Sequence, residues 1–523
     1  MGLFDFFKNK KKRTLGNASR EQAVNRIMAA YQDVAGDDPA IARHFEDAKA
    51  GSHAAIFDKT TRDEIMEKAR FEIANNPNLK GIVNTKAQDV IGRQPKLRFL
   101  PDESRTQVAG TAKDVADSLS SKFASWAKSV NLGEKLRTAC TAKIIDGESF
   151  LFVSRNKASN HPLQLDIRLF DPERVADDPF SALKSENRNG YYDGIKYDAF
   201  DNPVRFHVAK DHPQGDTFNQ LSLQQPYDYF EISNKYMFHW FRKDRPEQRR
   251  GVSELASALP VASVLRRVKK AVALSNEVAA SISFLLETNY DGDDVIDSNG
   301  NTVDSTAYGG FSKVSYEAGT SMILPDGVTA KQLDSKHPNT SYLEFHNSCI
   351  NDIGRSIGLP YNKAAGNSSS YNYSSARLDH LSDEFGNTII REELINQFLD
   401  PIVLRLWIAF ALETDGYCDA QERAYLKAGM AYPKHSWSFD SIGHIDAVKE
   451  AKGKSIECAA GSNNRAHLLM AAGFDVDTHD TQAAEAYGFE SVEEYRKAVA
   501  FATFGQMQAE EQPEQQQEND QEE

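Results

Sequence analysis

Residues 343–394 read "LEFHNSCINDIGRSIGLPYNKAAGNSSSYNYSSARLDHLSDEFGNTIIREEL", in which two helical patterns are separated by a polar insertion. The insertion, residues 358–377, contains Gly366, three consecutive serines and two tyrosines, Tyr371 and Tyr373. Small polar side chains bury too little apolar surface to hold a loop rigid. The insertion is therefore either a mobile surface loop or a loop kept soft at a functional site.

The length of the chain, 523 residues, predicts more than one hydrophobic core. Its hydrophobic fraction of 40% and charged fraction of 26% are typical of a soluble globular protein. The four cysteines are widely spaced and form no CxxC pair. This argues against both a disulfide scaffold and a zinc site, and a reducing cytoplasm fits the composition best.

The two ends of the chain differ in charge. Residues 1–19 begin "MGLFDFFKNKKKR", with the apolar residues before the basic ones, which is the reverse of a secretory signal. We expect a basic tail that binds a partner, with a short membrane-surface anchor as the alternative. Residues 506–523 are rich in Gln and Glu and are expected to be disordered. No uninterrupted apolar run approaches the ~20 residues that span a bilayer, so no membrane partner is expected.

The formal net charge of −15 opposes tight binding to phosphate. The same negative charge is compatible with a protein along which DNA slides without being bound tightly.

The first half of the chain mixes helical and strand patterns. Residues 61–92 predict one helix broken at Asn75–Pro77 and stopped by Gly92, and residues 107–142 predict two helices around Trp126. Alternating runs predict strands at "PKLRFLP", "GESFLFVSR", "LQLDIRLFDPERV", "KYMFHWFR" and a hairpin at "GIKYDAFDNPVRFHVAK". His239, in the fourth of these runs, is expected to be a half-buried strand residue. This part of the chain is predicted to be α+β.

A long amphipathic helix is predicted over residues 261–289. One face carries apolar side chains and is expected to pack in a ring of copies. The other face carries a basic strip made of Arg266, Arg267, Lys269 and Lys270. Two interpretations of the strip stay open, namely a solvated face that pairs with neighbouring carboxylates and a surface that contacts phosphates.

The remaining pattern gives an order of elements. Short β-prone runs follow the long helix, a helix returns over residues 341–357, and a helix of about 35 residues follows the insertion up to Gly416, with Pro401 expected to kink it. Several short helices fill residues 440–505.

Motifs for chemistry are missing from the sequence. The acidic group around Asp293 and Asp297 fails the EF-hand spacing, and no HExxH, GxSxG or GxxxxGK[ST] occurs. We therefore expect no catalytic residue, no cofactor and no metal. A DNA hydrolase that uses Mg²⁺ held by Asp293 and Asp297 is kept as the alternative from a different class.

Four stretches carry a resemblance to a known family. They are "RFEIANNPNLKGIVNTKAQDVIG", "HWFRKDRPEQRRGVSELASALP", "IGLPYNKAAGNSSSYNYSSAR" and "SIGHIDAVKEAKGKSIECAAGSNNRAHLLMAAGFD". With the order of elements, they make residues 20–505 resemble the portal proteins of tailed bacteriophages, specifically the lambda-type family.

The resemblance implies a multi-domain α+β protein with wing, stem, clip and crown regions and long stem and wing helices. Mapped by order, the regions are the wing at 20–255 and 378–435, the stem at 256–289 and 341–357, the clip at 290–340, the tunnel loop at 358–377 and the crown at 436–505. The tunnel-loop residues that would face DNA are Asn367, Ser368, Ser369, Ser370, Tyr371, Asn372 and Tyr373.

The resemblance also implies partners. Such a chain forms a ring, typically of twelve subunits, at one capsid vertex, and double-stranded DNA passes through it during packaging and ejection. The large terminase subunit, the major capsid and scaffold proteins and a head–tail adaptor are the implied partners, and a separate ATPase supplies the energy. The protein would reside in the virion after assembly in the host cytoplasm. Another ring-forming head–tail connector is the alternative within viral assembly.

Overall fold

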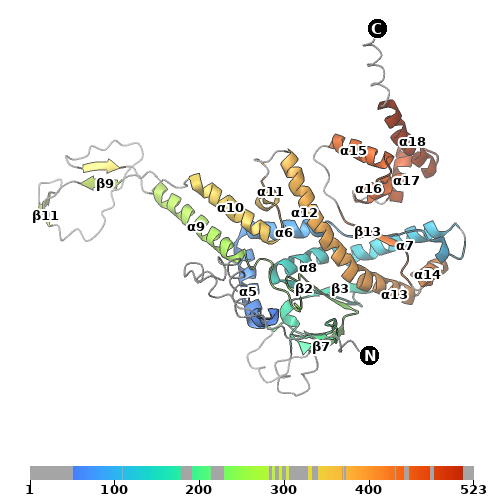
Figure 1. Ribbon diagram of the computed structural model, residues 1–523, viewed down its shortest axis with the longest axis horizontal. Helices are drawn as coiled ribbons and strands as arrows, with labels where there is room; N and C mark the ends of the chain where they lie inside the picture. Colours follow the sequence, from blue (N-terminus) through green and yellow to red (C-terminus); the bar gives the residue numbers. More distant parts are fainter. Residues whose placement is uncertain are drawn as a thin grey trace, which may run out of the picture.

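The computed structural model describes a central body with projections on two sides (Figure 1). It covers residues 51–108, 110–177, 191–213, 229–281, 285–288, 294–296, 302–304, 328–331, 340–367, 369, 373–429, 431–440, 447–471 and 476–510. Two helices, α9 and α10, project side by side from the body, and a group of helices, α15 to α18, lies at another corner. The basic tail predicted at residues 1–19 lies outside the described residues.

The helices of the body follow the predicted pattern. Asn76 breaks the first pair, because its side chain accepts hydrogen bonds from the N–H groups of Asn78 and Leu79 and Pro77 occupies the first helical position. The predicted break at Asn75–Pro77 and the stop at Gly92 are confirmed. These helices are α4 (His53–Ile56), α5 (Lys59–Asn75), α6 (Pro77–Ile91), α7 (Ala112–Ser129) and α8 (Leu132–Asp146).

Three small sheets complete the body. The predicted strand β1 (Lys96–Phe99) pairs antiparallel with β13 (His435–Ser438), which lies more than 300 residues later in the chain. The second sheet has the order β3-β2-β8 and the third the order β4-β5-β6-β7. Their strands are β2 (Glu148–Arg155), β3 (Leu165–Phe170), β4 (Tyr191–Tyr192), β5 (Ile195–Tyr197), β6 (Pro203–Ala209), β7 (Tyr229–Ser233) and β8 (Met237–Phe241). The hairpin predicted at "GIKYDAFDNPVRFHVAK" is the β5–β6 pair.

The main core lies between these helices and the helix that follows the insertion. Phe123 of α7 packs edge to face against Trp407, with ring centroids 5.4 Å apart, and both are fully buried. A second, smaller core around Phe150 and Phe206 joins the two larger sheets. The alternation of apolar residues along the strands explains which residues enter each core.

The projecting helices are α9 (Leu259–Ser281) and α10 (Thr340–Ser356). The helix predicted over 261–289 is therefore too long, because residues 285–288 form strand β9 (Leu285–Thr288). This strand pairs antiparallel with β12 (Val328–Lys331), a partner 40 residues away that the helical pattern does not reveal. Beyond it, β10 (Asp294–Ile296) pairs with β11 (Thr302–Asp304).

A continuous helix runs from Tyr373 to Glu413. It consists of α12 (Tyr373–Leu394), a π-helical segment η9 (Ile395–Leu404) and α13 (Arg405–Glu413). Pro401 lies inside the π-helical segment, where the wider turn accommodates a residue without an N–H group. The sequence predicted a kink at Pro401, and the structure has a π-helical segment there within an unbroken helix.

By length and composition this helix could cross a membrane, but packing accounts for its apolar residues. Its most apolar window has a mean hydropathy of 1.4, and 56% of that window is buried inside the protein. Phe398, Leu399, Val403 and Leu404 are all fully buried in the main core.

The predicted short helices near the C-terminus are present. They are α15 (Ala447–Ala459), α16 (Arg465–Ala471), α17 (Val476–Tyr487) and α18 (Val492–Glu510). Helix α14 (Ala420–Lys427) precedes them and was not predicted. The disorder predicted from residue 506 onward is wrong for residues 506–510, which extend α18, and residues 511–523 lie outside the described part. The residues of this stretch, "QMQAE", all have high helix propensity and favour a helix once α18 has been nucleated. All four cysteines are free thiols, as expected.

Candidate functional site: the loop between α11 and α12 and its charged base

The polar insertion is shorter in the structure than the sequence predicts. Residues 361–365 form the helix α11 (Tyr361–Ala365), and α12 already begins at Tyr373. Gly366 ends α11 in the left-handed conformation, with φ of 61°, which a residue without a Cβ adopts freely. Ala364 is buried, and this apolar contact orders the first half of the insertion. The loop itself is therefore limited to residues 366–372.

The predicted loop residues divide into three groups. Asn367 and Ser369 lie in the loop, where the Ser369 N–H donates to Asn367 Oδ1 over 2.9 Å. Tyr373 is the first residue of α12 and no longer a loop residue. The others lie outside the described residues, and they are Ser368, Ser370, Tyr371 and Asn372.

A cluster of charged and polar side chains, partly buried, joins the helices on the two sides of this loop. We call it the loop base, and its members are Lys86, Asp89, Lys363, Asp383 and Asn387. Lys363, just before the loop, lies with its Nζ 2.8 Å from Asp89 Oδ2 and 2.6 Å from Asp383 Oδ2. Lys86 of α6 donates to Asp383 Oδ1 over 2.9 Å and to Asn387 Oδ1 over 2.8 Å. Asp383 therefore accepts from one lysine on each side, and α6, α11 and α12 are joined directly beneath the loop.

The loop base is shielded from water. Lys86, Asp383 and Asn387 are 5%, 3% and 0% exposed. Burial alone would raise the pKa of Asp383, but its hydrogen bonds from Lys363 and Lys86 lower the pKa below its usual value. Burial alone would lower the pKa of Lys363, but Asp383 and Asp89 raise it. The charges of Asp383 and Lys363 are thus both retained near neutral pH.

Arg391 extends the attachment along α12. Its Nε donates to the carbonyl oxygen of Val90 over 2.7 Å, and its guanidinium also reaches the carbonyl of Asp89. Both carbonyls belong to the last turn of α6, where no helical N–H is available to pair with them. Arg391 therefore attaches α12 to the end of α6.

The sequence contained a signal for this cluster that the initial interpretation missed. Lys86 falls on the same helical stripe as the buried residues Ile82, Val83 and Val90, and Asp383, Asn387 and Arg391 recur every four residues. When one helix carries a lysine on its apolar stripe and another helix carries a polar stripe, we expect the lysine to pair with that polar stripe in the interior.

The basic strip on α9 separates into two kinds of residue. Arg266 Nη2 donates to Glu72 Oε1 over 2.7 Å, and its guanidinium lies over the ring of Phe71. For Arg266 the first interpretation of the strip, pairing with a neighbouring carboxylate, is therefore supported. Arg267, Lys269 and Lys270 are exposed, and none forms an ion pair within the described part of the chain.

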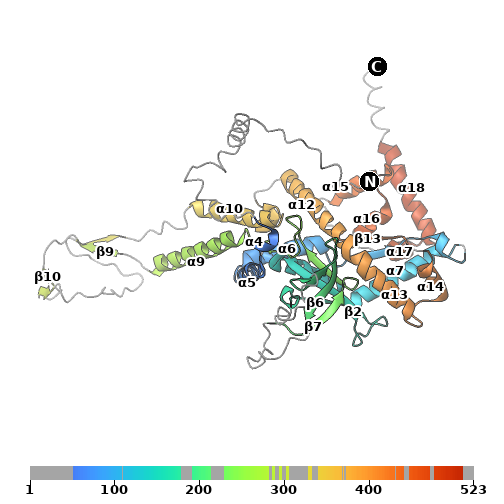
Figure 2. The same cartoon turned by 60° about the horizontal axis from the view of Figure 1, so that its bottom comes forward.

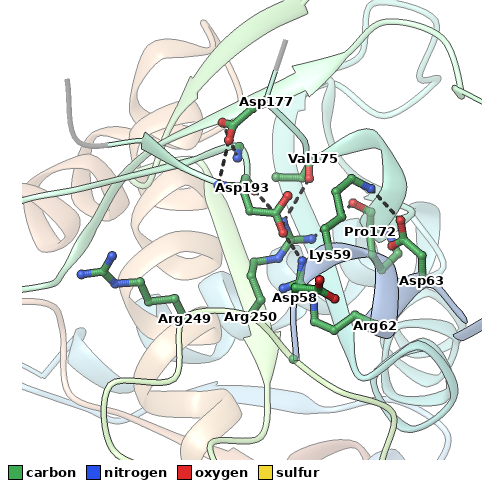
Figure 3. A network of polar contacts seen from close by, with 12 residues as sticks. Asp58, Lys59, Arg62, Asp63, Pro172, Val175, Asp177, Asp193, Arg249 and Arg250 are labelled. Carbon is green, nitrogen blue, oxygen red and sulfur yellow. Dashed lines mark hydrogen bonds and ion pairs between the residues drawn. The ribbon is translucent and has the colours of Figure 1, made fainter. Parts of the chain in front are cut away.

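A second buried network holds the segment that leads into α9 (Figure 3). Arg250 Nε lies 2.9 Å and 3.0 Å from the two carboxylate oxygens of Glu148, and its Nη1 lies 3.1 Å from Asp193 Oδ2. Arg62 of α5 pairs with the same carboxylate oxygen of Asp193. Burial would raise the pKa of Glu148, but Arg250 and His239 lower it.

His239 belongs to this network and lies in strand β8 as predicted, but it is buried and not half-buried. It is 9% exposed, its Nε2 lies 2.7 Å from Glu148 Oε2, and burial lowers its pKa. The backbone here is also close-packed, since a Cβ on Gly251 would lie 2.1 Å from the carbonyl oxygen of Gly147. The entry into α9 is therefore held in one position.

One further group has the composition of a metal site. The potential ligand atoms of Asp171, Glu173 and His212 lie within 4.8 Å of one another. Arg70 already pairs with Glu173 over 2.7 Å, so part of the negative charge is neutralised. Of the acidic residues singled out in the sequence, Asp294 lies in β10, whereas Asp293 and Asp297 lie outside the described residues.

Comparisons with known proteins give the family. A family model described as "Phage portal protein, lambda family" matches residues 41–387. A probable portal protein of Halomonas phage phiHAP-1 is 25% identical over 293 residues, which are 56% of this chain and 52% of that protein. The match thus spans about half the length of the curated relative.

Solved structures of gene transfer agent particles also resemble the chain at low similarity. A chain of a native virion has a TM-score of 0.36 and 12% identity, with 79% of this chain and 93% of that chain covered. A chain from the neck of an empty particle, with C6 symmetry, has a TM-score of 0.39, 12% identity and the same coverage. The family match covers more than half of the 523 residues, and the chain therefore belongs to the lambda family of phage portal proteins.

Proposed function

We propose that this chain forms a closed ring at one vertex of a phage capsid, through which double-stranded DNA is packaged and later ejected. Membership of the portal family carries this proposal. The ring would contain twelve subunits, perform no chemistry itself and depend on the ATPase of the large terminase subunit. The major capsid and scaffold proteins would surround it, and a head–tail adaptor would bind after packaging.

The elements can be assigned to the regions of a portal. The side-by-side helices α9 and α10 would form the stem, and the short strands beyond them, β9 to β12, the clip that meets the terminase or the adaptor (Figure 1). The body would be the wing and the group from α15 to α18 the crown. This assignment is supported by the order of elements and by the projection of α9 and α10 from the body.

The loop of residues 366–372 would be the tunnel loop. Its Asn, Ser and Tyr side chains offer hydrogen bonds and contact area without positive charge, so DNA would touch it without being held. The loop base supports this proposal, because it joins α11, which precedes the loop, to α12, which follows it. The exposed Arg267, Lys269 and Lys270 would contact either phosphates or the next subunit.

Two measurements test the proposal. Negative-stain images of the purified protein should show rings with a central channel, and a monodisperse monomer across salt and protein concentrations would contradict it. Tyr371→Ser should then reduce the DNA packaged per particle while rings still assemble. Tyr432→Ser, at an exposed position outside the loop, is the matched control and should package normally. If particles with Tyr371→Ser contain DNA of normal genome length, the assignment of this loop to the channel is wrong.

A further inference from the structure

Helix α12 exposes apolar side chains and buries polar ones. On its outer face, Leu378, Leu381, Phe385 and Ile389 are 68%, 55%, 72% and 45% exposed. We call these four residues the α12 apolar face. Their spacing of three and four residues places them on one side of the helix. The opposite side carries the buried residues of the loop base together with Arg391.

This arrangement is the reverse of an ordinary surface helix, which turns its apolar stripe to the core. Single exposed apolar residues are common, but a continuous stripe of four large ones along a helix marks a surface that another molecule covers. Within the described residues no other helix has as many exposed large apolar side chains.

Charge identifies what covers this face. The α12 apolar face continues at its C-terminal end into Glu392 and Glu393, both exposed and without an ion pair within the described residues. One side of α9 carries the complementary composition, with exposed Val264 and Leu274 on either side of Arg267 and Lys270. Each surface thus combines apolar side chains with two charges, and the charges are opposite in sign.

We propose that the α12 apolar face packs against α9 of a second copy of this chain. The inference rests on the proposed ring, and it names the surfaces through which neighbouring subunits meet. Because α9 and α12 are different surfaces, the contact is heterologous and repeats from copy to copy, which is how a ring closes. Burial of the four apolar residues would provide affinity, and the pairing of Glu392 and Glu393 with Arg267 and Lys270 would set the register.

The contact would also position the loop. Helix α12 begins where the loop of residues 366–372 ends, and the loop base joins α12 to α11, which precedes the loop. A subunit contact along α12 would therefore set the point at which each loop ends relative to the next copy.

The apolar part is tested with Leu381→Ser combined with Phe385→Ser in the full chain. We expect the protein concentration needed for ring assembly to rise at least about tenfold, since buried apolar anchors dominate most interfaces. Thermal stability of the subunit should not change, because both side chains are exposed. The control is Phe200→Ser, at a residue that is 86% exposed in the β5–β6 turn. Assembly is measured by sedimentation velocity and negative-stain imaging.

The assignment to α9 is tested by charge reversal. Glu392→Lys with Glu393→Lys should weaken assembly, and adding Arg267→Glu with Lys270→Glu should restore it. Rings that form normally with the serine variant overturn the α12 contact. Failure of the second reversal to restore assembly overturns the choice of α9. Absence of rings from the unmodified protein instead contradicts the proposed function itself.

Discussion

Helices α9 and α12 are both amphipathic, but they turn opposite kinds of face toward the body. Helix α9 exposes Arg267 and Lys270 and buries Ala262 and Leu265 in the core of its own subunit, although its apolar face was expected to pack in a ring of copies. Helix α12 buries Asp383, Asn387 and Arg391 and exposes the α12 apolar face. The difference arises from what lies opposite, because α12 faces Lys86, Lys363 and the end of α6, which require polar partners.

The comparison indicates that a helix in a subunit that assembles can bury side chains in two places. One is the core of its own subunit, and the other is the contact with a neighbour. For α9 the apolar stripe serves the subunit. For α12 the polar stripe serves the subunit and, on our proposal, the apolar stripe serves the assembly.

Among the variants that test this difference between α9 and α12, Asp383→Ala should have the largest effect on stability. It leaves Lys86 buried with one amide partner and removes half of the pairing of Lys363, and truncation of one member of a buried ion pair typically costs about 3–5 kcal/mol. Urea unfolding of the purified subunit measures this loss. Glu392→Ala on the exposed side of the same helix is the control and should have almost no effect. Equal stability of the two variants would show that the loop base does not support α12.

Acid should weaken the loop base selectively. The pKa of Asp383 is lowered in the folded protein from an ordinary value of 3.8, so its contribution is fully present above about pH 4. That contribution is lost as the pH falls through the lowered folded pKa, because the unfolded chain then takes up the proton first. The stability advantage of the unmodified protein over Asp383→Asn should therefore shrink below about pH 4. Thermal melts of both proteins from pH 7 to pH 3 measure it, and an advantage that grows on acidification would contradict the assignment.

The smallest expected effects on stability distinguish Arg266 from Arg267, which are neighbours on α9. Arg266→Ala removes the pair with Glu72, which is 5% exposed, and should lower the melting temperature. The loss should be clearly smaller than for Asp383→Ala, since the Arg266 side chain is 36% exposed and solvent replaces part of the interaction. Arg267→Ala should leave the melting temperature unchanged and affect assembly only. A larger thermal effect for Arg267 than for Arg266 would reverse our interpretation of this face.

Much of the fold followed from local pattern. The helix break at Asn76, the stop at Gly92, the hairpin between β5 and β6 and the return of α10 depend on caps, turn residues and periodicity within short stretches. Long-range pairing did not follow in the same way. Strand β9 was predicted as the end of a helix because its partner, β12, lies 40 residues away.

The candidate site was predicted in part. The unusual composition located the loop, but its bounds of 358–377 contracted to 366–372 once α11 and the start of α12 had formed. The loop base was missed altogether, because its members lie on three helices and the two most distant members, Lys86 and Asn387, are 301 residues apart in the chain.

The sequence by itself determined the order of elements, the family, the polar composition of the loop and the amphipathic character of α9 and α12. Only the tertiary structure decided which face of each helix turns inward. Local periodicity fixes that a helix has two faces, but the free energy of each face depends on the groups it meets. For α12 those groups are the buried Lys86, the half-buried Lys363 and the last carbonyls of α6, so polar pairing outweighs the usual preference for an apolar interior.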